Sequence, residues 1–395
     1  MDEEFIRNDR HRAEVAAMQN EIYRLKKNIS DMEEKRIAES TADPCDPFGN
    51  PTEYHEYHDN YSEIQPLINS PGYTPEFEPA ALERSNIRKF YAIGGWCNLM
   101  RFLAAYWLIR NVLKIIVSVI QSGNPQADGT AVAAYVESSS IIFGLNMLFF
   151  GLTNVGFAFL GMKLSGQRMS SLLKPKGFGF FDFVQYSVMG FSLWYLSVIL
   201  GYFSSEVFSA FGIEINSSGS LPVTGIGLAV YALYTCIIAP VTEELFYRGM
   251  LLRTFSKSSQ RFGIFSTALM FGLGHGNIHQ FILGFIVGIF LAHITLKHNS
   301  IIPSITVHVV LNTMTVVLSM LELTRHEELI LIKAQLILAF VGLMLLVLFR
   351  VRDKLPVTTP AQVRRGIPVA IGSLGFVLAA AAHIAIMIVN IYSIN

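Results

Sequence analysis

Two adjacent glutamates and two histidines lie deep inside apolar stretches of this 395-residue sequence. Glu243 and Glu244 follow Pro240, and His275 and His308 occur in two later apolar stretches. An ionisable side chain in hydrocarbon costs several kcal/mol unless it is paired, so each is a candidate functional residue. A carboxylate accompanied by histidines suits one task in particular, the activation of a water molecule by a general base.

The spacing of the acidic residues separates their roles. Glu244 and Arg248 are four residues apart on one helical face, so we expect them to pair, which leaves Glu243 without a local partner. Asp182 is the only other acid inside an apolar stretch. It lies near the basic end of that stretch, which favours a structural role.

Three apolar stretches place polar groups at a similar depth. At about 1.5 Å per residue, Glu243, His275 and His308 lie about 15, 20 and 14 Å from the nearest basic loop. Asn312 follows His308 by four residues, and Phe271 precedes His275 by four. The bundle must bring these groups together, because exposure to lipid would be too costly. His308 and Asn312 could then donate two hydrogen bonds to a developing oxyanion.

Other hydrolytic sites are excluded by inspection. The sequence has no HExxH helix and no GxSxG turn, and its single intramembrane aspartate cannot form a pair. One glutamate and two histidines, Glu243, His275 and His308, could in principle ligate zinc. Spacing alone does not decide that question. His279 falls where the chain turns, and we expect a structural role for it.

The elements that position these residues are membrane helices. The chain is 52% hydrophobic and only 15% charged, unlike an ordinary soluble enzyme. Hydropathy predicts an all-α, polytopic transmembrane bundle of eight or nine helices around a polar intramembrane cavity. The expected spans are 97–120, 138–162, 178–203, 223–252, 263–278, 280–297, 301–320, 329–349 and 367–392. On the first span, the spacing of Arg101, Arg110 and Lys114 predicts a helix lying partly against the interface.

The loops predict the orientation of the bundle. Loops 163–177, 253–262 and 350–366 are rich in lysine and arginine, whereas loops 121–137 and 204–222 have none. By the positive-inside rule, the basic loops and the N-terminus are cytoplasmic. We expect a bacterial plasma membrane, or the endoplasmic reticulum if the source is eukaryotic.

The N-terminal part differs in composition from the rest. Residues 1–40 predict a cytoplasmic amphipathic or short coiled-coil helix, whose apolar seam within 13–33 would contact a protein partner or a second copy. Residues 41–90 predict an acidic, proline-rich linker, and residues 91–395 the membrane domain. The charge distribution shows no basic surface of the kind that binds nucleic acid, so we expect no nucleic-acid partner.

Three motifs in fixed order give the sequence a family resemblance. E-E-x-x-x-R, F-x-x-x-H and H-x-x-x-N, on successive apolar segments within 223–320, resemble the CPBP (Abi) intramembrane proteases, which include CAAX prenyl endopeptidases and bacteriocin-processing enzymes. The resemblance implies that 223–320 is the catalytic core. The motif residues are Glu243, Glu244, Arg248, Phe271, His275, His308 and Asn312.

The resemblance also implies a role for each motif residue. Glu243 and His275 would activate the hydrolytic water, and His308 and Asn312 would form the oxyanion hole. Glu244, Arg248 and Phe271 would support the site, with Arg248 and Glu244 shaping it or meeting a substrate carboxylate. The resemblance implies catalysis without a metal or other cofactor.

The expected function is cleavage of membrane-associated peptides, such as prenylated CAAX-type or leader-peptide substrates. The expected partners are membrane lipid and a peptide or lipidated protein substrate. The alternative is a non-proteolytic regulator or scaffold that recruits partners through its N-terminal part. A transporter is a distant third, because interior ionisable residues also line ion pathways.

Overall fold

The computed structural model describes most of the membrane domain and a short N-terminal helix. The described residues are 18–28, 79–124, 126, 128–132, 140–169, 172–213, 225–256, 260–352 and 368–392. The chain separates into two compact units, Met1–Pro44 and Cys45–Asn395. In the first unit, residues 18–28 are helical and exposed. The rest of the 13–33 seam and residues 41–78 of the expected linker lie outside the described residues, so both stay predictions.

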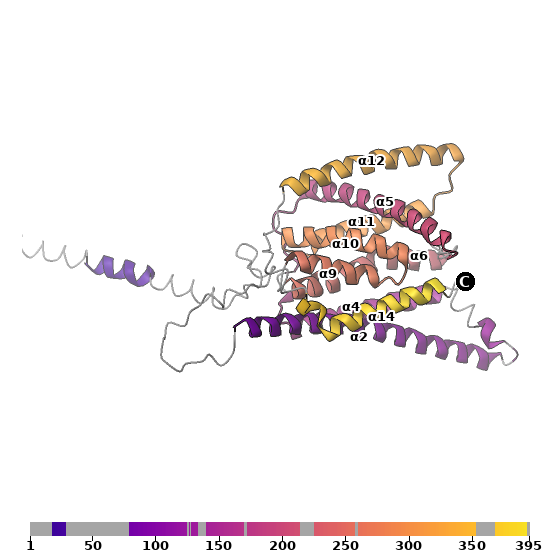
Figure 1. The fold of residues 1–395 in the computed structure, drawn as a ribbon, viewed down its shortest axis with the longest axis horizontal. Helices are drawn as coiled ribbons and strands as arrows, with labels where there is room; N and C mark the ends of the chain where they lie inside the picture. The colour runs from indigo at the N-terminus through magenta and orange to yellow at the C-terminus, as the bar shows by residue number, and fades with distance from the viewer. Residues whose placement is uncertain are drawn as a thin grey trace, which may run out of the picture. The chain divides into compact units, whose positions relative to one another are not determined.

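The described part of the second unit is helical, without strands (Figure 1). Its α-helices are α2 (Pro79–Gly123), α4 (Ser140–Leu164), α5 (Phe180–Ala210), α6 (Gly225–Leu233), α7 (Ala239–Glu244), α8 (Arg253–Phe255), α9 (Gln260–Leu273), α10 (Ile278–His298), α11 (Ile302–Ser319), α12 (Arg325–Arg352) and α14 (Leu374–Tyr392). The π-helical segments η3 (Tyr234–Ile238) and η4 (Leu245–Leu252) join α6, α7 and α8 into one continuous rod.

Within the described residues, eight helical stretches are long and apolar enough to cross a membrane. This confirms a polytopic helical bundle, and the chain is a multi-pass integral membrane protein. The rod from Gly225 to Phe255 is one of the eight stretches. The expected span 263–278 is replaced by α9, whose 14 residues cover about 21 Å. α9 is therefore shorter than a full crossing, and its far end carries the turn that holds His275.

The first span begins earlier than its apolar residues suggest. α2 starts at Pro79, inside the range 41–90 expected to be linker, and proline is favoured in the first turn of a helix. Figure 1 shows α2 lying beside α14 and α4. A Cβ atom added to Gly95 would collide with the backbone of Gly375, so α2 and α14 are in close backbone contact. Glycine permits this approach between membrane helices.

The described parts of two expected basic loops, 163–177 and 253–262, lie at one end of the bundle. The Lys176 amide donates to the His298 carbonyl at 2.9 Å, and the Arg253 guanidinium donates to the Arg168 carbonyl at 2.9 Å. The loop after α4, the start of α8 and the end of α10 therefore lie together. For these two loops, the arrangement agrees with the expected alternation of basic and non-basic loops. Which side of the membrane this end faces stays a prediction.

Asp182 has the structural role expected of it. The residue lies in the first turn of α5, and its carboxylate accepts a hydrogen bond from the Gly179 amide at 3.0 Å. A carboxylate in this position compensates the partial positive charge of the helix N-terminus.

Candidate active site

The two glutamates lie in a short α-helical segment between two π-helical segments of one continuous helix. α7, which ends at Glu244, is preceded by η3 and followed by η4. Pro240 has no amide hydrogen, so the carbonyl five residues earlier, that of Thr235, loses the donor a π-helical turn would give it. The Ala239 amide, in contrast, still donates to the Tyr234 carbonyl.

Asn312 supplies the donor that Pro240 lacks. Its side-chain amide on α11 donates to the Thr235 carbonyl at 2.8 Å. This contact joins α11 to the irregular part of the helix that carries Glu243. The amide nitrogen of an asparagine carries two hydrogens, so a second one remains for another acceptor.

Asn312→Ala is expected to destabilise the protein by about 1–3 kcal/mol, because it leaves the Thr235 carbonyl without its donor. The check is the thermal unfolding temperature of the detergent-solubilised protein. Asn146→Ala on α4 is the control, since Asn146 lines a separate pocket to which neither Asn312 nor Thr235 contributes. Equal unfolding temperatures for the two variants would show that the Asn312 contact contributes nothing.

Glu244 is the buried centre of an ion-pair network. Its Oε1 accepts from Arg248 Nη1 at 2.7 Å and from His308 Nδ1 at 2.9 Å. Both Glu244 and Arg248 are fully buried. Arg248 also donates to the Gly288 carbonyl of α10 at 3.3 Å. The expected Glu244–Arg248 pair is therefore present, and it holds α7, α10 and α11 together.

His308 connects the two glutamates. A carboxylate oxygen can only accept, so His308 Nδ1 carries the hydrogen in its bond to Glu244. His308 Nε2 then faces Glu243, with 3.9 Å between Nε2 and Oε2, too long for a direct hydrogen bond. The Glu243 side chain is 22% exposed, whereas that of Glu244 is fully buried. Glu243 is thus the carboxylate of the pair that water can reach.

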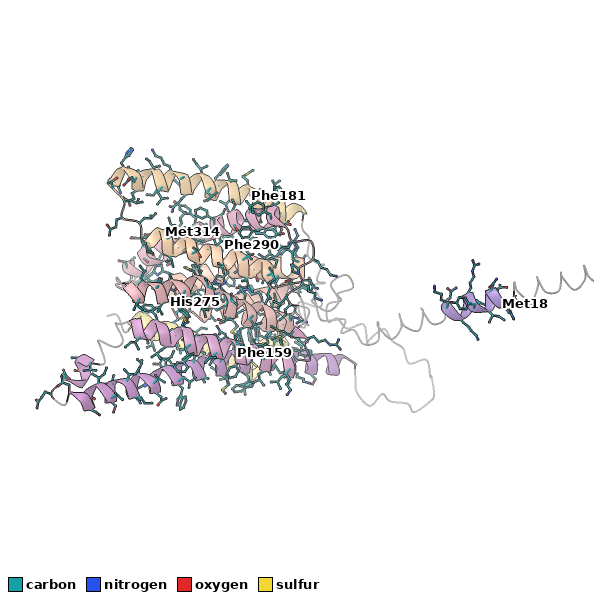
Figure 2. All side chains as sticks on the ribbon, turned by 180° about the vertical axis from the view of Figure 1, so that it is seen from behind. Met18, Phe159, Phe181, His275, Phe290 and Met314 are labelled. Atoms are coloured by element: carbon teal, nitrogen blue, oxygen red, sulfur yellow. The ribbon has the colours of Figure 1, made fainter. Side chains whose placement is uncertain are left out.

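The turn between α9 and α10 positions His275. Gly276 adopts a left-handed conformation with φ 64°, which glycine tolerates without strain. The Asn277 side chain then caps α10 by accepting from the amides of His279 and Gln280 at 2.9 and 3.3 Å. Figure 2 shows the labelled His275 among the central helices of the bundle.

The imidazole of His275 has a defined tautomer. Its Nδ1 lies 2.9 Å from the Phe271 carbonyl, which can only accept, so Nδ1 carries the hydrogen. Nε2 of the neutral ring is then a proton acceptor. Among the described residues, no hydrogen bond or ion pair joins His275 to Glu243. The nearby His279 lies 2.7 Å from the Ser205 hydroxyl of α5, a structural contact.

The Phe271 ring lies at the centre of the motif residues. The rings of His275 and His308 meet it edge-on, at 5.0 and 5.8 Å between centroids. The Arg248 guanidinium lies 4.4 Å above the same ring. An aromatic ring between a cation and two imidazoles excludes water from the ion pair and strengthens it. Phe271 therefore supports all three motifs at once.

The location predicted for Arg101 is wrong. We expected it against the interface, but it is buried and donates to Asn154, Asn98 and Tyr247. Tyr247 lies in η4, four residues after Glu243, so Arg101 is close to the candidate site. Its burial depends on partners 53 and 146 residues away, which no local spacing reveals.

The possible metal ligands His, Cys, Asp and Glu do not form a metal site in the described residues. In the described part of the chain, no group of three or more His, Cys, Asp and Glu side chains converges as metal ligands would. The zinc set considered above, Glu243, His275 and His308, is therefore not gathered into one group. Independence from metals and other cofactors stays a prediction.

Comparison with known proteins gave one finding. Residues 225–314 match the family model described as Type II CAAX prenyl endopeptidase Rce1-like. The match covers all three motifs and confirms the family resemblance that they indicated. It supports a CAAX-type membrane protease, with membrane lipid and peptide as partners, at the level of the family. No curated protein and no solved structure matched the chain.

Proposed function

We propose that this chain is a glutamate-dependent intramembrane endopeptidase that cleaves CAAX-type peptides, which end in a prenylated cysteine, two aliphatic residues and one further residue. The observation that carries the proposal is the placement of the two glutamates. Glu243 is partly exposed and lies near His308 Nε2. Glu244 is buried and accepts a hydrogen bond from Nδ1 of the same imidazole. The family match over residues 225–314 supports the substrate class.

The proposed reaction begins with a water molecule between Glu243 and His275. Glu243 takes a proton from the water, whose oxygen attacks the carbonyl carbon of the scissile amide. The neutral His275, with Nε2 free to accept, holds the second hydrogen of that water. The proton on Glu243 then passes to the departing amine, so the products are a carboxylic acid and an amine.

The developing oxyanion needs hydrogen-bond donors close to the carbonyl oxygen. In the proposal, His308 Nε2 donates one of these hydrogen bonds, while its Nδ1 donates to Glu244. The second amide hydrogen of Asn312 is the other donor. Donors fixed before the reaction are the most effective form of transition-state stabilisation. The Glu244 and Thr235 contacts supply that fixation.

His275→Ala is expected to lower kcat/KM by about 10²–10³, because the attacking water loses one of its two acceptors. The measurement uses the purified full-length protein in liposomes, a farnesylated CAAX-type peptide and mass spectrometry of the released C-terminal fragment. His279→Ala is the matched control. It removes an imidazole four residues away that bonds Ser205, and it is expected to keep most of the activity. Full activity of His275→Ala would remove this residue from the mechanism.

A further inference from the structure

Arg101 is a buried cation in the middle of α2. Only 4% of the residue is exposed. Its Nη1 donates to Asn154 Oδ1 at 2.6 Å, and its Nη2 donates to Asn98 Oδ1 at 3.2 Å and to the Tyr247 hydroxyl at 2.8 Å. The guanidinium also lies 4.7 and 5.2 Å from the ring centroids of Phe246 and Tyr247. All of these partners are neutral.

No carboxylate of the described residues lies within ion-pair distance of Arg101. Arg248, the other buried cation near the site, is paired with Glu244 at 2.7 Å. The Nε atom of Arg101 is buried and has no hydrogen-bond partner. A buried cation that lacks an anion is strongly unfavourable in a membrane protein, and such groups are retained mainly for function. Arg248 therefore has a carboxylate in direct contact, whereas Arg101 has none among the described residues.

Two contacts place Arg101 beside Glu243. Asn154, which accepts from Arg101, donates in turn to the Thr242 hydroxyl at 3.1 Å, and Thr242 immediately precedes Glu243. On the other side, Tyr247 follows Glu243 by four residues, about one helical turn or ~6 Å along the axis. The guanidinium thus lies alongside the turn of helix that starts at Glu243.

The same region borders the turn that carries His275. A Cβ atom added to Gly274 would lie 2.7 Å from the Tyr247 hydroxyl, so the absence of a side chain at Gly274 makes room for that hydroxyl. Arg101, through Tyr247, therefore contacts the segment immediately before His275. Both residues assigned to water activation have Arg101 or one of its partners as a neighbour.

We propose that Arg101 binds the C-terminal carboxylate of the peptide substrate and so selects for a scissile bond a few residues from the chain end. This inference rests on the proposed endopeptidase function. The ~6 Å between the levels of Glu243 and Tyr247 corresponds to about two extended residues. A carboxylate in place of a neutral acceptor makes stronger, charge-assisted hydrogen bonds and supplies the missing negative charge. Arg248, already neutralised, is not available for this task.

The experiment compares two forms of one farnesylated CAAX-type peptide, with a free C-terminal carboxylate or with a carboxamide. For the wild-type full-length protein in liposomes, kcat/KM is expected to be at least about tenfold higher for the acid, a factor worth about 1.4 kcal/mol. Arg101→Gln is expected to lose this preference and Arg101→Lys to keep part of it. Arg110→Gln, an exposed position on the same helix, is expected to keep the wild-type preference.

Several outcomes would overturn the inference. Equal cleavage of acid and amide by the wild type would do so without any variant, and it remains decisive if Arg101→Gln fails to fold. Equal losses for both peptides in Arg101→Gln would assign Arg101 a structural role. In both cases cleavage that still depends on Glu243 leaves the proposed function intact. Cleavage that survives loss of Glu243 would instead refute the proposed function itself.

Discussion

Glu243→Gln is expected to lower kcat/KM for a farnesylated CAAX-type peptide by about 10³-fold or more, while the unfolding temperature changes little. Glutamine keeps the size of the side chain but cannot take a proton from water, so the general base is lost. The fold should tolerate the change, because this side chain is 22% exposed and its ion-pair partner His308 lies 3.9 Å away, beyond hydrogen-bond distance. The loss should appear in kcat, because the missing step is chemical.

The control for Glu243→Gln is Glu206→Gln, at an exposed position of α5. It makes the same chemical change away from the site and should leave cleavage unaffected. The measurement is the initial rate of fragment release by purified protein in liposomes, with the unfolding temperature determined in parallel. If Glu243→Gln retains a tenth or more of the wild-type rate, glutamate-dependent catalysis is wrong for this protein.

Arg248→Ala is expected to destabilise the protein by about 3–5 kcal/mol, the usual cost of leaving one partner of a buried ion pair alone. Glu244 would then lose the guanidinium that balances its charge, and its carboxylate would remain fully buried beside His308. The stacking of Arg248 on Phe271 would be lost as well. A variant this unstable should give little folded protein after extraction into detergent.

A double-mutant cycle separates the pair from the packing around it. Glu244→Gln alone should also be severe, because it leaves the Arg248 cation unpaired. Glu244→Gln combined with Arg248→Met removes both charges, so it should lose much less stability than the sum of the single changes. The measurement is the yield of monodisperse protein with its unfolding temperature. Additive losses would show that the two charges do not interact.

The parts of the site predicted from the sequence are those that depend on short spacings. Glu244 and Arg248 pair because residues four apart share a helical face, and that geometry needs no knowledge of the fold. The apolar spans were predictable for a similar reason, since their length is set by the thickness of hydrocarbon. The common depth of Glu243 and His308 followed from the rise of a helix.

The remaining features depend on contacts that are distant in the sequence. Asn312 matched a motif, yet its bond to the Thr235 carbonyl follows from the gap that Pro240 leaves in another helix. Arg101 looked like an interfacial residue, because its burial is created by Asn154 and Tyr247. α9 is short because its chain turns at Gly276, a property of backbone conformation that hydropathy does not report.

The length of α2 ties the candidate site to the thickness of the bilayer. Its 45 residues extend about 67 Å, whereas a bilayer with its headgroups measures about 40–45 Å. Its apolar portion, Ile87–Gly123, is longer than the hydrocarbon, a mismatch that helices relieve by tilting. A thinner membrane is expected to require more tilt of α2, the helix that carries Arg101. Lipid chain length is therefore expected to act on α2, whose Arg101 bonds Tyr247 one helical turn from Glu243.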